Sequence, residues 1–200
     1  MYELILVSES PRRRDILNKS GFIYLTDSLK ISEFINENIN LTDAIIAVSR
    51  QKSEAYVEAH KSLENKEILV LTADTVVVFD GKAYGKPKNN TQAIEFIQKF
   101  NGKMHSVITA VTLFNFKYME SFSFYDSTDV YFKCSTDQEI NDYVNSGEPM
   151  GKAGAYAIQG LGQSLVEKIN GSFNNVVGLP IEKLIEVLDE KSWVVDRRKS

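Results

Sequence analysis

A short segment near the start of the chain places hydroxyl and guanidinium groups directly after an apolar run. Residues 4–7 are apolar, and Ser8, Ser10, Arg12 and Arg13 follow. A strand that ends where a helix begins leaves backbone N–H groups unpaired, with the positive end of the helix dipole behind them. Such a turn binds phosphate, and serine and arginine side chains add donors. The segment therefore predicts a phosphate site, with a helix cap beside a solvated charged face as the alternative.

A second candidate is the carboxylate of Asp74, which lies inside the apolar, β-branched run 68–81. A carboxylate in such a strand loses much of its hydration, so it needs a hydrogen-bond partner, a cation or a catalytic role. The alternative is a structural aspartate at a break in the strand. Just downstream, Lys86 lies in the loop 84–87, between a glycine and a proline.

A third candidate is the glycine-rich stretch 151–178, which holds six of the eleven glycines of the chain. Glycine at this density indicates turns with positive φ, or backbone that passes close to a flat ligand. Gln159 lies in this stretch, where its amide could recognise the edge of a nucleotide base. Tight hairpins are the structural alternative.

The elements expected to position these groups alternate between strands and helices. Strands are predicted over 3–7, 68–81, 105–116, 121–133, 155–158 and 166–169, from their apolar and β-branched residues. Helices are predicted over 11–19, from Thr42 through 59, from 89 or 90 to 102, from Thr136 to 147, and from Pro180 to 189. Helices mixed with crossover and hairpin strands indicate an α/β fold with a mixed sheet.

The composition limits the classes of function. A net charge of -4 and a pI near 5.3 disfavour general nucleic-acid binding. The single cysteine, Cys134, and the lack of a secretion signal or a long apolar run predict one cytoplasmic domain over residues 1–200, without membrane association. The sequence lacks the P-loop, dinucleotide-binding, zinc-protease and serine-hydrolase motifs. His105 is predicted to be a packed or capping residue rather than a catalyst.

Together these stretches resemble the Maf family of nucleoside triphosphate pyrophosphatases, also called septum-formation inhibitor proteins. The matching segments span nearly the whole chain: Ser8–Arg13, Ala73–Val77, Gly85–Pro87, Thr128–Val130, Lys152–Tyr156, Ile158–Gly160 and Val177–Pro180. Gln159 is similar to the branch that acts on dTTP and UTP. The branch that acts on 7-methyl-GTP usually has a glutamate there.

The resemblance implies an elongated mixed sheet flanked by helices, with two lobes around a cleft, as in inosine triphosphate pyrophosphatases. It implies hydrolysis between the α and β phosphates, with a divalent cation, Mg²⁺ or Mn²⁺. Asp74 would be the proton acceptor, and Lys52, Lys86 and Glu33 further catalytic positions, with Asp74 and Glu33 at the metal. Substrate would be bound by Ser8, Ser10, Arg12, Arg13, Thr75 and Gln159, and among these Arg12 or Arg13, Thr75 and Gln159 would set the base preference.

These expectations lead to a cytoplasmic dTTP/UTP pyrophosphatase, for which a homodimer is plausible. Three alternatives stay open. The first is the same chemistry on 7-methyl-GTP, and the second is a non-catalytic nucleotide-binding regulator of cell division. The third is a binding domain with a degenerate site, because Glu9 places an acid inside the proposed phosphate loop.

Overall fold

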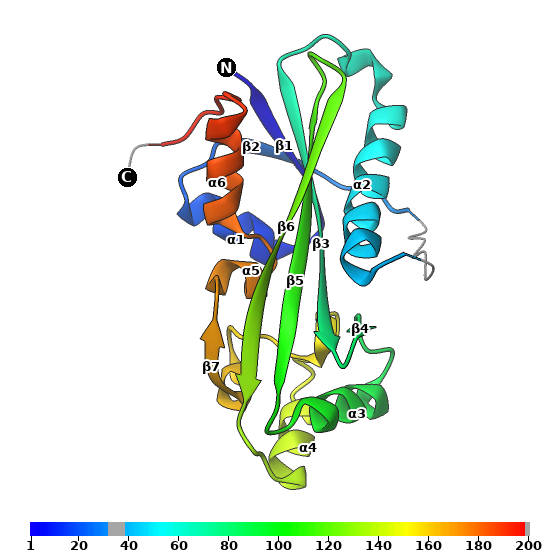
Figure 1. The fold of residues 1–200 in the computed structure, drawn as a ribbon, viewed down its shortest axis with the longest axis vertical. Helices are drawn as coiled ribbons and strands as arrows, with labels where there is room; N and C mark the ends of the chain where they lie inside the picture. Colours follow the sequence, from blue (N-terminus) through cyan, green and yellow to red (C-terminus); the bar gives the residue numbers. More distant parts are fainter. Residues whose placement is uncertain (32–38, 199–200) are drawn as a thin grey trace. The chain divides into compact units, whose positions relative to one another are not determined.

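The computed structural model describes residues 1–31 and 39–198, and a mixed β-sheet runs through it (Figure 1). Its strands are β1 (Glu3–Val7), β2 (Tyr24–Asp27), β3 (Ile68–Phe79), β4 (Lys82–Tyr84), β5 (Met104–Asn115), β6 (Glu120–Phe132) and β7 (Val166–Asn170). They pair in the order β2–β1–β3–β5–β6–β7, and β4 pairs with β3 outside this series. The pairs β1–β2 and β1–β3 are parallel, whereas β3–β4 and β6–β7 are antiparallel. The predicted mixed α/β class is therefore confirmed.

Helices connect and cover the strands. The α-helices are α1 (Pro11–Lys19), α2 (Leu41–Ala59), α3 (Asn90–Phe100), α4 (Asp137–Asn145), α5 (Phe173–Val177) and α6 (Ile181–Glu190). Short 3-10 helices cover Lys61–Leu63 (η1), Ala153–Ala155 (η2) and Leu161–Leu165 (η3). Local chemistry explains several helix starts. Pro11 presets the first φ of α1, and Thr136 with Glu139 forms a capping box at the start of α4.

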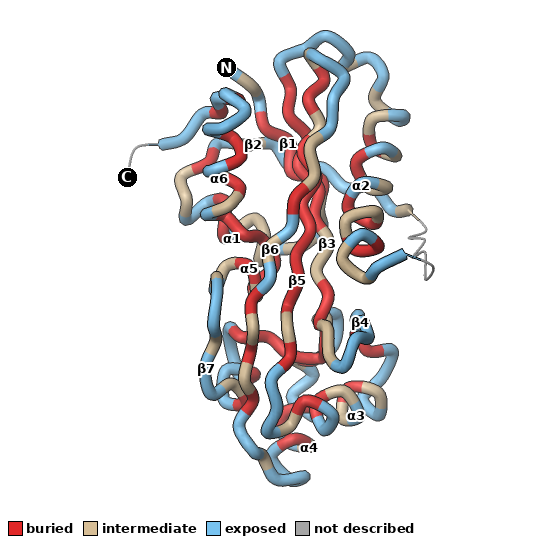
Figure 2. Tube along the Cα trace, viewed as in Figure 1, coloured by how far each residue is buried: buried red, intermediate tan, exposed pale blue. Residues whose placement is uncertain are grey.

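The chain divides into two compact units, and unit 1 consists of residues 1–74, 109–126 and 178–200. In this unit α2 covers one face of the sheet, and α1 and α6 cover the other (Figure 1). Ile5, Val70 and Tyr56 belong to one buried cluster, which joins β1 and β3 to α2. Figure 2 shows β1 buried along almost its whole length. This burial explains why the sequence of β1 is continuously apolar rather than alternating.

Unit 2 consists of residues 75–108 and 127–177, and its core is rich in aromatic side chains. His105 lies in this core, with its ring against those of Phe100 and Phe132. Burial lowers the pKa of His105 to about 3, so the ring is neutral at physiological pH. Its Nε2 shares a hydrogen bond of 2.8 Å with the hydroxyl of Tyr156. His105 is thus a packed residue, as the sequence predicted.

The structure differs from the sequence-based elements at several places. The predicted strand 155–158 is wrong, because η2 occupies its start and Gly154 and Ala155 have φ values of 65° and 62°. Helix α2 is capped by Asn40, which accepts a hydrogen bond from the N–H of Asp43, rather than by Thr42. The strands β2 and β4 and the short helix α5 were not predicted. The prediction of a single domain over 1–200 stays a prediction.

Candidate active site

The turn between β1 and α1 is the first group of candidate residues, and it lies in unit 1. Ser8 Oγ accepts hydrogen bonds from the N–H of Ser10 and from Nη1 of Arg13, both at 3.2 Å. Within the described part of the chain, the Ser10 side chain does not cap α1, and the first turn of α1 holds no acidic residue. No carboxylate of its own first turn therefore offsets the positive end of this helix dipole. Arg12 lies half-buried in the same turn.

Arg13 is held from two sides. Its Nε donates a 2.8 Å hydrogen bond to the carbonyl oxygen of Gly178, and its Nη1 bonds to Ser8. Gly178 has a φ of 127°, a conformation that favours glycine. The backbone that precedes α6 therefore fixes the direction in which Arg13 presents its charge. Because Gly178 lies 165 positions further along the chain, this contact could not be predicted from sequence spacing.

The second group is an ion pair between Lys52 and Asp74, also in unit 1. Lys52 Nζ lies 2.7 Å from Asp74 Oδ1, and both side chains are largely buried, with 20% and 17% of their surfaces exposed. Asp74 lies within the continuous strand β3, so it is not the predicted alternative of a structural aspartate at a strand break. An ion pair at this depth is oriented by its surroundings and is little screened by salt.

Buried hydroxyl groups fix the helix that carries Lys52 onto the strand that carries Asp74. Thr72 Oγ1 donates a 2.8 Å hydrogen bond to the carbonyl oxygen of Ser49, one turn before Lys52. Ser49 Oγ in turn shares a 2.8 Å hydrogen bond with Thr112 Oγ1 on β5. Ser49, Thr72 and Thr112 are fully buried. Polar groups at such depth are stable because they satisfy one another, and they define the register of α2 on the sheet.

A further contact links α2 to the turn between β1 and α1. Tyr56, one turn after Lys52, donates a 3.0 Å hydrogen bond to Oδ2 of Asp27, and the carbonyl oxygen of Asp27 accepts the N–H of Ser8 at 2.9 Å. Burial, followed by the hydrogen bond and charge of Asp27, raises the pKa of Tyr56 to about 12. The phenol therefore remains protonated and keeps donating. Sequence analysis missed Asp27 and Tyr56, which lie 29 positions apart.

The β1–α1 turn and Asp74 lie on neighbouring parallel strands, β1 and β3. In the β1–β3 ladder Leu6 is level with Leu71. The pairing ends there, two positions before Ser8 on one strand and three positions before Asp74 on the other. Ligands of open α/β sheets bind at the carboxyl ends of parallel strands, and the end of β1 is such a place. Unit 1 thus positions a potential anion-binding turn and a paired carboxylate.

The remaining predicted residues belong to unit 2. Thr75 directly follows Asp74 on β3 and is half-buried, whereas Lys86 and Gln159 are exposed. The loop of Lys86 is fixed by a 3.0 Å hydrogen bond from the N–H of Gly154 to the carbonyl oxygen of Gly85. A Cβ on Gly154 would lie 2.4 Å from Cγ2 of Val77, so glycine is required there. This contact gives the matched segments at 85–87 and 152–156 a shared structural role.

The matched Thr128 also has a structural role. Its Oγ1 donates to the carbonyl oxygen of Ser172 at 3.0 Å and accepts from Nδ2 of Asn175 at 3.0 Å. Nδ2 of Asn175 donates in addition to the carbonyl oxygen of Val107 at 2.9 Å. These contacts fix residues 171–175, which include the start of α5, to β5 and β6. Sequence analysis did not single out Asn175, although it lies in the glycine-rich stretch 151–178.

Metal ligands were predicted at Asp74 and Glu33, and Glu33 lies outside the described residues. Within residues 1–31 and 39–198, no group of three or more His, Cys, Asp or Glu side chains could hold a metal ion. Mg²⁺ in nucleotide sites is usually held by one or two carboxylates together with substrate phosphates. Asp74 supplies one such carboxylate. The residues present are thus compatible with a metal that arrives with its nucleotide.

A family model gives the decisive comparison. The model described as Maf-like protein matches residues 3–191 of this sequence. The chain belongs to the Maf-like protein family. This match confirms the resemblance inferred from the motifs between Ser8 and Pro180.

Relatives of this Maf-like protein carry a named activity. A "dTTP/UTP pyrophosphatase" of Bdellovibrio bacteriovorus is 42% identical over 187 residues, which cover 94% of this chain and 97% of the relative. A protein of the same name from Bacillus pumilus is 40% identical over 189 residues, which cover 94% and 96%. A solved "Nucleoside-triphosphatase / dITP/XTP pyrophosphatase" from Mycobacterium abscessus covers 95% of this chain and 93% of its own, with a TM-score of 0.42 and 10% identity. That likeness is weak, and no conclusion about the Maf-like protein rests on it.

Among the described residues, no helix is both long and apolar enough to cross a membrane.

Proposed function

We propose that this Maf-like protein is a nucleoside triphosphate pyrophosphatase that hydrolyses dTTP and UTP to the nucleoside monophosphate and pyrophosphate. Membership of the family and the names of its relatives, dTTP/UTP pyrophosphatases, support this function. The observation that carries it is the Lys52–Asp74 ion pair. The same unit of the chain contains the turn of Ser8 and Arg13. That combination suits phosphoanhydride hydrolysis, which needs cations for phosphate oxygens and a base for water.

The proposed mechanism assigns each group one task. The turn from Ser8 to Arg13 binds phosphate oxygens through N–H, hydroxyl and guanidinium donors. Asp74 orients a water molecule towards the α-phosphorus and accepts its proton as the new P–O bond forms. The bond from the α-phosphorus to the bridging oxygen breaks, and pyrophosphate leaves with the electron pair. Lys52 holds Asp74 in place and balances negative charge on the phosphates. Lys86 keeps the catalytic role that the resemblance implies for it.

A divalent cation, Mg²⁺ or Mn²⁺, belongs to this proposal. Asp74 would hold it together with phosphate oxygens, and Glu33 is the second proposed ligand. When bound, the cation would neutralise charge that develops on the leaving pyrophosphate. The proposal also keeps the cytoplasmic location and the possible homodimer as predictions, and it includes no nucleic-acid partner.

Base preference is assigned to Gln159 and Thr75, together with Arg12 or Arg13. An amide offers one acceptor and two donors, so it can pair with the O4 and N3–H edge that thymine and uracil share. A glutamate at position 159 would only accept hydrogen bonds, and it would repel the carbonyl O4. The exposed position of Gln159 in a glycine-rich turn is compatible with this role.

The test compares wild type with Gln159→Glu on dTTP, UTP, CTP, GTP and 7-methyl-GTP, each with Mg²⁺ or Mn²⁺. Chromatography separates monophosphate, diphosphate and pyrophosphate. We expect wild type to release monophosphate and pyrophosphate from dTTP and UTP. Gln159→Glu should lower kcat/KM for dTTP relative to 7-methyl-GTP by about 100-fold, because one hydrogen bond is lost and one repulsive contact is gained.

Thr75→Ser serves as the control, because it keeps the hydroxyl at the other proposed base-contacting position and should keep the preference for dTTP and UTP. Wild type that prefers 7-methyl-GTP would favour the sister branch. Absence of turnover with every nucleotide would favour a binding protein, and exposed Glu9 is then the first residue to replace.

A further inference from the structure

The segment that carries Gln159 is attached, on the C-terminal side of Gln159, to the carboxylate of Glu148. Oε1 of Glu148 accepts the N–H of Leu161 at 3.0 Å, and Oε2 accepts the N–H of Gly162 at 2.8 Å. A carboxylate that accepts two adjacent backbone N–H groups makes two charge-assisted hydrogen bonds with a defined geometry. Glu148 is half-buried, so water competes with these bonds only from one side.

On the N-terminal side of Gln159, the same segment is attached to α4. The N–H of Ala157 donates a 3.2 Å hydrogen bond to the buried hydroxyl of Tyr143, which lies on α4. Ser146 caps the end of this helix, and its Oγ accepts the N–H of Glu148 at 3.2 Å. One helix end thus supplies anchors on both sides of Gln159. All of these residues belong to unit 2.

Two glycines show how closely the anchors approach the segment. Gly160 has φ 101° and ψ −148°, a region that only glycine occupies without strain. A Cβ on Gly160 would lie 2.3 Å from Oε1 of Glu148. A Cβ on Gly162 would lie 2.4 Å from the carbonyl oxygen of Ala157 and 2.8 Å from the hydroxyl of Tyr143. The glycines therefore let the turn close directly onto its anchors.

We infer that Glu148 is a positioning residue for base recognition: its two hydrogen bonds to the backbone at Leu161 and Gly162 fix the turn from which Gln159 reaches the nucleotide base. This inference rests on the proposed function. Glu148 touches neither substrate nor phosphate in this account. It acts through the backbone, by reducing the number of directions in which the exposed Gln159 points before the nucleotide binds.

The test measures kcat and KM for dTTP and GTP in wild type, Glu148→Ala and Glu148→Gln. We expect Glu148→Ala to raise KM for dTTP about 10-fold with kcat changed less than about threefold, because base binding is lost and the phosphate chemistry is kept. The dTTP-over-GTP ratio of kcat/KM should fall by a similar factor. Glu148→Gln keeps one acceptor oxygen. Its changes in KM and in the dTTP-over-GTP ratio should therefore be about half of those in Glu148→Ala on a logarithmic scale.

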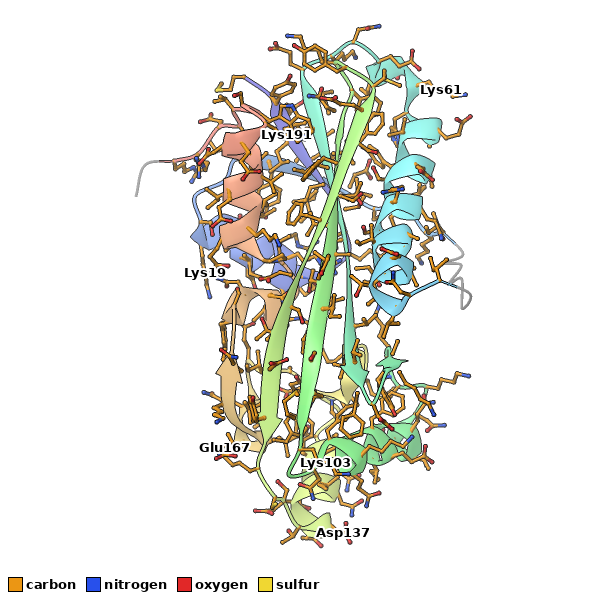
Figure 3. The ribbon with its side chains drawn as sticks, viewed as in Figure 1. Lys19, Lys61, Lys103, Asp137, Glu167 and Lys191 are labelled. Carbon is orange, nitrogen blue, oxygen red and sulfur yellow. The ribbon has the colours of Figure 1, made fainter. Side chains whose placement is uncertain are left out.

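Glu167→Ala is the matched control, because Glu167 is an exposed glutamate on β7 of the same unit (Figure 3). It should leave KM and the base preference unchanged. Hydrogen exchange in the peptide 157–165 provides a readout that needs no activity. The amides of Leu161 and Gly162 should exchange faster in Glu148→Ala, with the exchange of β5 unchanged.

The outcomes separate the inference from the proposed function. If wild type hydrolyses dTTP, and both Glu148 variants keep its KM and base preference while exchange at 157–165 rises, Glu148 is only a structural anchor and the inference is wrong. If Glu148→Ala does not fold, Glu148→Gln alone tests the inference. A partial loss of base preference in that variant would support it, and an unchanged preference would contradict it. If wild type hydrolyses no pyrimidine triphosphate, the proposed function fails first, and the inference falls with it.

Discussion

Replacement of Asp74 by asparagine is expected to lower kcat for dTTP and UTP by about 10²–10⁴-fold, the usual contribution of a general base. Asparagine has almost the same shape as aspartate, so β3 should keep its packing. It cannot accept the proton of the attacking water. It also removes the charge that Lys52 meets at 2.7 Å. Steady-state kinetics with pyrophosphate detection measures the loss, and circular dichroism checks the fold.

Asp80→Asn is the control for this replacement. Asp80 directly follows β3 and is exposed, with a φ of 50° that asparagine tolerates well. Its replacement should leave kcat unchanged. Wild-type kcat in Asp74→Asn would contradict the proposed role of Asp74. If Asp74→Asn also kept every effect on cell division while wild type turned over no nucleotide, the non-catalytic regulator would be the better account.

Replacement of Lys52 by methionine is expected to lower kcat/KM for dTTP by about 10²–10³-fold, the usual loss when one preorganised electrostatic group is removed. Methionine fills a similar volume, so α2 should still pack through Ser49 and Tyr56. The ammonium that orients Asp74 and balances phosphate charge is absent. Lys52→Arg should recover part of the loss, because the positive charge returns with a different geometry.

Lys61→Met is the matched control for Lys52→Met. Lys61 follows α2 (Figure 3), and its side chain is 62% exposed and paired with Glu58 on the surface. Exposed pairs of this kind contribute little, so kcat/KM and stability should remain near wild type. Equal kcat/KM in Lys52→Met and Lys61→Met would show that the buried ion pair is structural rather than functional.

The elements that sequence analysis located well carry their signals locally. Pro11 marks the start of α1, and Asp80 with Gly81 marks the turn after β3. The error at 155–158 has the opposite origin. The residues there are apolar because they are buried. Ala155 and Tyr156 belong to the core of unit 2, where η2 contacts α3, and their burial does not come from a strand. β2 was missed because its residues are half-buried or exposed, so no apolar pattern distinguishes them.

The site residues show the same division between local and distant information. The turn of Ser8 to Arg13 and the isolated charge of Asp74 stand out from their immediate neighbours in the sequence. Which groups they contact depends on pairs that are far apart in the chain, such as Arg13 with Gly178. The role proposed for Lys52 came from resemblance to a family, since a lysine in a soluble protein carries no signal by itself. The glycine-rich stretch around Gln159 suggested base recognition, and the resemblance added the preference for thymine and uracil.

The most direct measurement follows the oxygen of the attacking water. Wild type would hydrolyse dTTP in water enriched in ¹⁸O, and mass spectrometry would then locate the label in the products. The account predicts one ¹⁸O atom in dTMP and none in pyrophosphate, because water attacks the α-phosphorus. Label in pyrophosphate, or formation of dTDP with labelled phosphate, would mean attack at another phosphorus and would contradict the role proposed for Asp74.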